Sequence, residues 1–341
     1  MSEQLHTFEH EKLAAYLAAH VDGFSTLDGI VQFSDGQSNP TYRIESGDKT
    51  YVLRAKPPGK LLKSAHMVDR EFRVMNALRD TGVPVPRMFH LTGDDSPLGT
   101  IFFVMEFVAG RIFWDPVLPD LTEDGRSQIF KSMGQTLATL HNIDPESIGL
   151  GDFGKPGNYF ARQVDRWSQQ YKATELEKYP DVDWLMDWLA GNMVEDDGTV
   201  ALVHGDYRID NMIFHKDRPE IAAILDWELS TLGHPLADLA YQCMQWRLPN
   251  HGFTRGLGDI DRTSLGIPSE ETYVAVYCER RDIGKIANWN FYLVFSYFRL
   301  LAILQGVVRR AMDGNASNPR NHDLMRQAVP QLAADARSIL Q

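Results

Sequence analysis

Two short segments of the sequence carry side chains that could act together on a phosphate group. Residues 202–211 read Leu-Val-His-Gly-Asp-Tyr-Arg-Ile-Asp-Asn, and residues 223–228 read Ala-Ile-Leu-Asp-Trp-Glu. They supply one carboxylate (Asp206), one amide (Asn211) and a second carboxylate (Asp226). Phosphoryl transfer from Mg-ATP needs such a set: an Asp to orient or deprotonate the acceptor hydroxyl, and an Asn and an Asp to hold metal on the phosphates.

The residues between these segments predict a hairpin. An apolar run at 212–215 is followed by a polar turn at 216–219 and a second β-prone run at 221–225. Asn211 stands just before the first strand and Asp226 just after the second, so we expect both to reach one cation. Mg²⁺ takes oxygen ligands, usually one or two protein side chains with phosphates and water. Glu228 is a further candidate, for a second Mg²⁺ or a water on it.

The same residues allow other interpretations. A lone His-Gly-Asp is usually a turn before a helix or strand. His204, Asp206, His215 and Asp226 could also be scattered ligands of a metal hydrolase, which would bind Zn²⁺ tightly and work without ATP.

The N-terminal part of the chain offers residues that could bind a nucleotide. The loop at 34–39, with Gly36, Ser38 and Asn39, lies between two expected strands, and its amides and side chains could face an anion. Alone it is a common hairpin loop. Arg54 and Lys56 alternate along one strand, where a cation would contact the α and β phosphates. Arg presents a planar fork of donors suited to phosphate, and a solvated strand end is the alternative.

Three motifs carry a resemblance to a known family. They are His-Gly-Asp through Asn at 204–211, Leu-Asp-Trp-Glu at 225–228 and Gly-His-Pro-Leu-Ala-Asp-Leu-Ala at 233–240. The sequence resembles the aminoglycoside phosphotransferase and choline kinase group, which has a protein-kinase-like fold. The phrases at 51–59, 110–116 and 149–158 look more specifically like the kinase-like domain at the N-terminus of some acyl-CoA dehydrogenases.

This resemblance implies roles on the nucleotide side. Arg54 holds the place of the protein-kinase lysine, Lys56 is the reserve candidate, and Glu71 pairs with the strand cation. The backbone of Glu106 and Val108 would read adenine. The loop at 34–39 departs from the triple-glycine loop of protein kinases.

On the transfer side, the resemblance implies that Asp206 is the catalytic base and that Asp226 and Asn211 are the main metal ligands. Asp238 would cap backbone amides of the catalytic loop, and His204 would brace that loop. The implied cofactors are ATP and Mg²⁺, and the partner is a small-molecule hydroxyl acceptor. The link to acyl-CoA dehydrogenases suggests a hydroxylated metabolite, such as a hydroxyacyl thioester. A rival hypothesis is a pseudokinase or nucleotide-binding module, which Arg54 in place of Lys supports and the complete catalytic set opposes.

The expected fold class is α+β, a protein-kinase-like fold of two lobes. Residues 1–108 would form a nucleotide-binding N-lobe with a small antiparallel sheet, and 109–341 a mainly helical C-lobe with the catalytic loop and the acceptor site. Strands are expected at 30–33, 41–46, 50–55, 88–91 and 100–107. Helices are expected at 10–20, 64–78, 122–140, 159–171, 183–192, 236–246, 270–282, 286–312 and 322–340, with Ser64 and Thr122 as N-caps.

Composition limits the possible environments and partners. The net charge of −12 argues against general nucleic-acid binding, which requires neutralisation of phosphates. Cys243 and Cys278 provide no disulfide framework, and the N-terminus resembles no signal peptide, so a reducing cytoplasm is the expected location. The apolar run at 286–308 contains Arg299 and other polar residues and is expected to be a core helix rather than a membrane span. Oligomeric state is not predicted.

Overall fold

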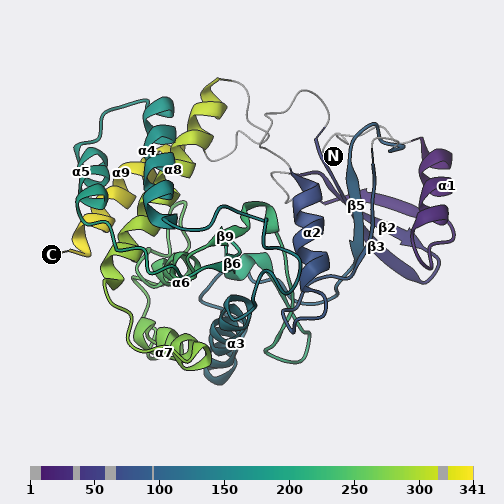
Figure 1. Cartoon of the computed structure of the whole chain (residues 1–341). Helices are drawn as coiled ribbons and strands as arrows, with labels where there is room; N and C mark the ends of the chain where they lie inside the picture. The colour runs from purple at the N-terminus through teal and green to yellow at the C-terminus, as the bar shows by residue number, and fades with distance from the viewer. Residues whose placement is uncertain (1–8, 34–38, 58–66, 94–95, 314–321, 341) are drawn as a thin grey trace. The chain divides into compact units, whose positions relative to one another are not determined.

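The chain divides into two compact units, each assembled from separate stretches of sequence (Figure 1). The computed structural model describes residues 9–33, 39–57, 67–93, 96–313 and 322–340. The smaller unit comprises Met1–Arg111, Met212–Asp217 and Ile221–Ser230. The larger unit comprises Ile112–Asn211, Arg218–Glu220 and Thr231–Gln341.

The smaller unit is built on an antiparallel sheet of five strands in the order β1-β2-β3-β5-β4. The register places Arg54 of β3 opposite Thr41 of β2 and Phe103 of β5. The strands are β1 (Gly29–Gln32), β2 (Thr41–Ser46), β3 (Lys49–Ala55), β4 (Met88–Leu91) and β5 (Phe102–Glu106).

A helix covers each face of this sheet (Figure 1). Because side chains alternate along a strand, Tyr51 and Leu53 of β3 join the core under α1 (His10–His20). Arg54, between positions 53 and 55, therefore lies on the other face, where α2 (Val68–Leu78) packs on β4 and β5.

The predicted hairpin is present and belongs to the smaller unit. Its strands are β7 (Met212–Phe214) and β8 (Ile221–Ile224), and the short 3-10 helix η2 (Trp227–Leu229) follows. Two backbone hydrogen bonds of 2.8 Å join Phe214 to Arg111, and the amide of Ile224 donates to the carbonyl of Pro84 at 2.9 Å. These hydrogen bonds attach the hairpin that precedes Asp226 to Pro84 and Arg111, which are more than 100 residues earlier in the sequence.

The larger unit is mainly helical, with one short antiparallel ladder between β6 and β9. Its elements are α3 (Glu123–His141), α4 (Tyr159–Thr174), α5 (Pro180–Gly191), β6 (Ala201–Val203), η1 (Ile209–Asn211), β9 (Thr231–Gly233), α6 (Leu236–Cys243), η3 (Met244–Trp246), α7 (Glu270–Arg281), α8 (Trp289–Met312) and α9 (His322–Ser338).

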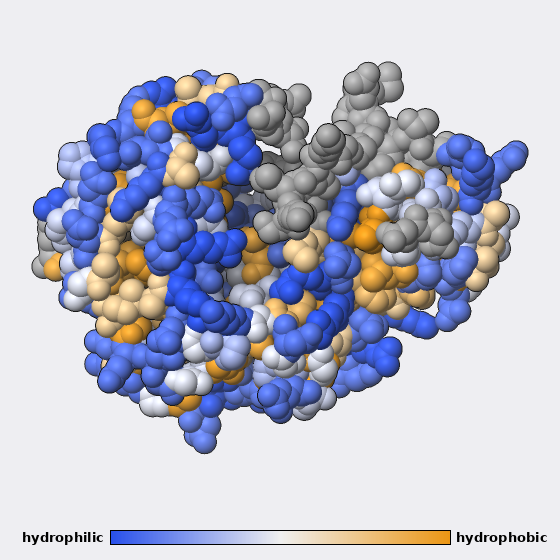
Figure 2. All heavy atoms as spheres, turned by 45° about the horizontal axis from the view of Figure 1, so that its top comes forward, coloured by the Kyte–Doolittle hydropathy of each residue, from blue (hydrophilic) through white to orange (hydrophobic). Residues whose placement is uncertain are grey.

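Helix α8 forms the core of this unit, in contact with α4, α5, α6 and α9. It is long and apolar enough to cross a membrane, but 89% of its most apolar window is buried inside the structure. This burial is typical of the core helix of a soluble protein. On the face drawn in Figure 2, hydrophilic residues predominate and the apolar patches are small and scattered.

The predicted α+β class, with a small antiparallel sheet and a helical part, is confirmed. Thr122 caps α3 as predicted, since its side chain accepts a hydrogen bond from the Gly125 amide. Some predicted boundaries are wrong: α8 begins at Trp289 rather than 286, and β5 is shorter than the run at 100–107. Ser64 lies outside the described residues, and α2 is described from Val68.

Candidate active site

A largely buried arginine, whose side chain is 14% exposed, links two carboxylates in the smaller unit. Arg54 Nε lies 2.8 Å from Glu71 Oε2, and Arg54 Nη2 donates to Asp226 Oδ1 at 2.8 Å. The first contact is an ion pair without hydrogen-bond alignment, whereas the second is a hydrogen bond. Arg54 thus pairs with Glu71, as the resemblance implied, and also reaches Asp226.

The helical period explains why the acidic partner is buried. Glu71 is only 1% exposed, because it lies one turn from Val68 and Met75 within the buried stripe of α2. Burial raises the pKa of Glu71 to about 7, against the opposing charge of Arg54. Burial lowers the pKa of Arg54, but the nearby carboxylates outweigh it and the net pKa is raised. The cluster therefore holds Arg54 as a cation.

Asp226 occupies an unusual backbone position. Its φ is +64°, in the left-handed region that non-glycine residues seldom adopt. Such a conformation costs on the order of 1–3 kcal/mol and persists only where the surroundings fix it. The β7–β8 ladder before it and the 3-10 turn at Trp227–Leu229 after it do so. Glu228 lies in that turn and is half-buried.

The other residues predicted to bind the nucleotide differ in where the structure places them. Gly36 and Ser38 lie outside the described residues. Asn39 is buried, and its Nδ2 donates to Glu71 Oε1 at 2.9 Å, so it belongs to the Arg54 cluster. Glu106 ends β5 and its amide donates to the carbonyl of Arg87.

Two more residues concern the adenine and phosphate predictions. Val108, two positions after the end of β5, is half-buried. Lys56, the reserve cation, has its Nζ 3.7 Å from Asp69 Oδ1.

In the larger unit, a fully buried carboxylate organises the loop at 204–211, the predicted catalytic loop. Asp238 of α6 accepts the His204 amide at 2.6 Å and the Gly205 amide at 2.9 Å. His141 Nε2 lies 3.3 Å from Asp238 Oδ2, and the Tyr277 hydroxyl lies 2.8 Å from His141 Nδ1. Burial raises the pKa of Asp238, but these donors more than offset it and the net pKa is lowered. The predicted capping role of Asp238 is confirmed.

Hydrogen bonds within this loop fix the orientation of the Asp206 side chain. Asn211 Nδ2 donates to Asp206 Oδ2 and to the Asp206 carbonyl, both at 2.9 Å. The Asp206 amide donates to His204 Nδ1 at 3.1 Å, which agrees with the predicted bracing role of His204. Arg208 pairs with Asp210 at 2.6 Å rather than with Asp206.

One residue absent from the predicted site contacts this loop, and a second is affected by its charge. Burial raises the pKa of Tyr241 of α6, and the charge of Asp206 raises it further. Arg299 of α8 donates from Nη2 to the carbonyl of Gly205. Signals for both exist: Tyr241 follows Asp238 by three positions, and Arg299 interrupts an apolar helix.

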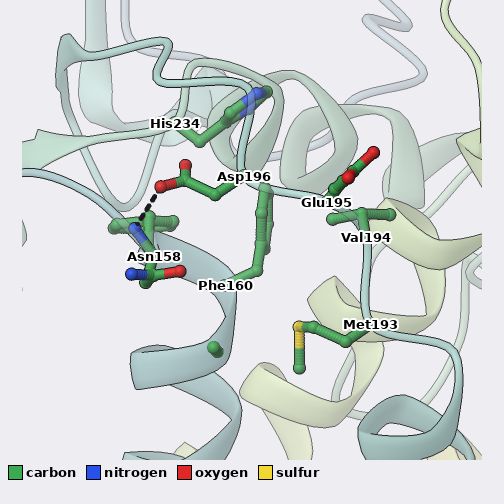
Figure 3. A pocket seen from close by; sticks show the side chains of 9 residues that line it. Asn158, Phe160, Met193, Val194, Glu195, Asp196 and His234 are labelled. Carbon is green, nitrogen blue, oxygen red and sulfur yellow. Dashed lines mark hydrogen bonds between the residues drawn. The ribbon is translucent and has the colours of Figure 1, made fainter.

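A small cavity of about 50 Å³ lies at the start of α4, next to the segment at 193–196 (Figure 3). The Asn158 amide donates to Asp196 Oδ2 at 2.7 Å, and His234 faces the same space. The β6–β9 register pairs Gly233 with Ala201 and Thr231 with Val203. His234 and His204 therefore follow opposite ends of this ladder, and none of the residues that line the cavity belongs to the segment at 204–211.

Comparison with known proteins gives consistent matches. A sequence profile described as the phosphotransferase enzyme family matches residues 29–265. Acyl-CoA dehydrogenase family member 10 of Mus musculus is 48% identical over 290 residues, which cover 85% of this chain and 27% of that protein. This chain thus spans about a quarter of the length of that relative.

Solved structures agree with the sequence matches. A crystal structure from Ralstonia eutropha, described as an aminoglycoside phosphotransferase, is 43% identical with a TM-score of 0.88, covering 98% of this chain and 99% of that one. Spectinomycin phosphotransferase with ADP and spectinomycin, at 14% identity, has a TM-score of 0.63 and covers 97% and 98% of the two chains. These matches confirm the predicted resemblance and the kinase-like fold.

The Arg54 cluster yields a prediction about stability. We expect Arg54→Met to lower the free energy of unfolding by about 3–5 kcal/mol, because Glu71 is left buried without its cation. The double variant Arg54→Met/Glu71→Leu should lose less, since no buried charge remains unpaired. Urea unfolding measures both. Arg43→Met, which breaks an exposed pair with Glu45, is the control and should cost under about 1 kcal/mol. A double variant less stable than Arg54→Met would contradict this account.

The buried histidine yields a prediction about pH. Burial lowers the pKa of His141, whereas in the unfolded chain a histidine titrates near about 6.5. As the pH falls below about 6.5, the unfolded chain gains a proton that the folded chain refuses, so stability falls by up to about 1.4 kcal/mol per pH unit. In His141→Gln this part of the slope should disappear below about pH 6.5. Exposed His251→Gln is the control, and an unchanged slope in His141→Gln would refute the assignment.

Proposed function

Because the chain belongs to the phosphotransferase enzyme family, we propose that it is a small-molecule kinase that uses Mg-ATP to phosphorylate a hydroxyl group. The observation that carries this proposal is the set of contacts around Asp206. Its carboxylate accepts from Asn211, and the backbone before it is anchored by Asp238. An oriented carboxylate on a fixed loop suits a general base.

The proposed reaction uses Asp206 to align the acceptor hydroxyl and to take its proton. The acceptor oxygen forms a bond to the γ-phosphorus of ATP, and the bond from that phosphorus to the β–γ bridging oxygen breaks. The products are ADP, the phosphate ester and one proton. Positioning supplies much of the rate, because phosphoryl transfer needs little covalent chemistry from the protein.

We assign the nucleotide to residues 1–108, the proposed N-lobe. Arg54, kept cationic by its acidic neighbours, would contact the phosphates through its planar fork of donors. Glu71 would hold Arg54 in place. The backbone of Glu106 and Val108 would read adenine, and the loop with Gly36, Ser38 and Asn39 would cover the phosphates. The ADP complex of spectinomycin phosphotransferase, which has this fold, supports nucleotide binding here.

The side chains present suit magnesium, which prefers oxygen ligands. Asn211 turns its Nδ2 toward Asp206, which leaves its Oδ1 as a ligand, and Asp226 and Glu228 offer carboxylates. Met212 pairs with Ile224 in the β7–β8 ladder, so Asn211 and Asp226 flank the same end of one hairpin. Bound Mg²⁺ would neutralise charge on the phosphates. The Arg54 contact to one oxygen of Asp226 leaves the other as a ligand.

The chemical class of the acceptor is a more specific part of the proposal. Similarity to an acyl-CoA dehydrogenase family member favours a hydroxylated metabolite, and a hydroxyacyl thioester is the specific candidate. The rival function, a nucleotide-binding module without transfer activity, is favoured by Arg54 at the place of the kinase lysine. An assay for a phosphorylated product separates the two functions.

The first prediction of this proposal concerns the catalytic base. Wild-type protein with labelled ATP, Mg²⁺ and a small-molecule cell extract should yield a phosphorylated metabolite resolved by mass. On that acceptor, Asp206→Asn should bind ATP normally but turn over about 10²-fold or more slowly, as is typical when a general base is lost. Wild-type turnover by Asp206→Asn would remove Asp206 from this role. Confirmed Mg-ATP binding without any product would favour the nucleotide-binding module.

The second prediction concerns the metal. Asp226→Ala should abolish the Mg²⁺-dependent part of ATP binding, because the main carboxylate ligand is lost. Titration calorimetry with and without Mg²⁺ measures this difference. Asp217→Ala is a matched control, since Asp217 is an exposed acid in the turn of the same hairpin. Equal Mg²⁺ dependence in wild type and Asp226→Ala would refute the assignment.

A further inference from the structure

A chain of buried side chains connects α7 to the predicted catalytic loop. The Tyr277 hydroxyl of α7 lies 2.8 Å from His141 Nδ1, and His141 Nε2 lies 3.3 Å from Asp238 Oδ2. The same carboxylate accepts the amides of His204 and Gly205. None of the three linked side chains is more than 3% exposed. The chain of contacts therefore runs from a helix late in the sequence to the backbone of the loop.

The charge of Asp238 determines which nitrogen of His141 carries the proton. Burial lowers the pKa of His141, so at neutral pH its ring is uncharged and carries one proton. An unprotonated nitrogen that faced the carboxylate would repel it, so the proton is on Nε2 and Nδ1 accepts from the Tyr277 hydroxyl. Tyr277 thus stabilises the one tautomer of His141 that donates to Asp238.

Helix α7 is fixed at both of its ends, which fixes the position of this hydroxyl. At the start of the helix, Glu270 accepts two hydrogen bonds from Arg247, at 2.8 and 3.1 Å. At the end of the helix, Arg281 donates to the carbonyl of His141. Tyr277 lies one helical turn before Arg281 and therefore on the same face. The backbone and the ring of His141 are thus both held by α7.

We propose that Tyr277 is a positioning residue: it keeps His141 as a donor to Asp238 and so holds the loop that carries the proposed base. Without its hydroxyl, the proton of His141 could move to Nδ1, and Asp238 would then face a lone pair in place of a donor. The two loop amides would be held less tightly, and Asp206 with them. The proposal rests on the proposed function for the role of Asp206.

Removal of one hydroxyl tests this proposal. Tyr277→Phe keeps the ring in the core and removes only the donor to His141. With water as the acceptor, we expect the kcat for release of inorganic phosphate from Mg-ATP to fall by about threefold to tenfold, the loss typical of one neutral hydrogen bond. The Kd of Mg-ATP should stay within about twofold, because the nucleotide is assigned to residues 1–108.

Tyr273→Phe is the matched control for this substitution. Tyr273 lies on the same helix, one turn before Tyr277, and is also buried. Its hydroxyl has no hydrogen-bond partner among the described residues, so its loss should leave kcat unchanged. A kcat in Tyr277→Phe equal to that of wild type would overturn the proposal.

The tautomer of His141 can be observed without any activity. In protein labelled with ¹⁵N in its histidines, long-range ¹H–¹⁵N spectra distinguish a proton on Nε2 from one on Nδ1, and the signals missing from His141→Gln identify those of His141. We expect the Nε2 form alone in wild type and a mixture of both forms in Tyr277→Phe. The Nε2 form alone in both proteins would refute the role of Tyr277. This change of tautomer in a protein that releases no phosphate would overturn the proposed function and leave the chain of contacts intact.

A conservative pair at His141 tests the next step of the chain. Glutamine can still donate an amide proton to Asp238, whereas leucine keeps only the apolar bulk. Hydrogen exchange at the amides of His204 and Gly205 should be faster in His141→Leu and close to the wild-type rate in His141→Gln, with kcat in the same order. Amides of the smaller unit are the internal reference for global stability. Equal exchange in the two variants would mean that donation by His141 does not hold the loop, and the proposal would be wrong.

Discussion

The predicted catalytic loop depends on hydrogen bonds and a histidine contact that satisfy one buried charge, the carboxylate of Asp238. Asp238 has no exposed surface, and a carboxylate in such a place is tolerable only when donors surround it. The donors are the amides of His204 and Gly205 together with His141. The need to satisfy Asp238 therefore dictates the backbone path directly before Asp206. Every residue of the same helix, α6, is buried, so the packing of this core also fixes the backbone that carries the proposed base.

In the smaller unit the central charge is positive: the largely buried Arg54 contacts the carboxylates of both Glu71 and Asp226. The alternation of β3 directs Arg54 to the face covered by α2, and the helical period directs Glu71 toward it. A third contributor comes from a hairpin more than 150 residues later, since Asp226 accepts from the same guanidinium. A buried charge that has no other partner available gives a site a defined geometry, because leaving that charge unpaired costs free energy.

The parts that the sequence could predict are those governed by local periodicity and by motif spacing. The hairpin around β7 and β8 follows from such signals, whereas the pairing of Arg54 with Glu71 and the capping role of Asp238 were implied by the resemblance to the phosphotransferase family. Arg299 was missed although it interrupts an apolar helix, because a charged residue in such a helix does not reveal its partner. Its contact with the carbonyl of Gly205 exists only once α8 packs in the core of the larger unit. The strands β6 and β9, with three residues each, are too short to produce a clear alternation.

The contacts around Asp206 also explain why the acceptor is harder to identify than the type of reaction. The contacts that hold Asp206 and the backbone before it come from Asn211, Asp238 and Arg299, and each is made within the protein itself. Such a network constrains where a hydroxyl must be placed but not what molecule carries it. Residues that recognise the rest of the acceptor can therefore vary without disturbing the base. Motifs built from the network accordingly define a family of phosphotransferases, whereas acceptor choice depends on side chains outside it.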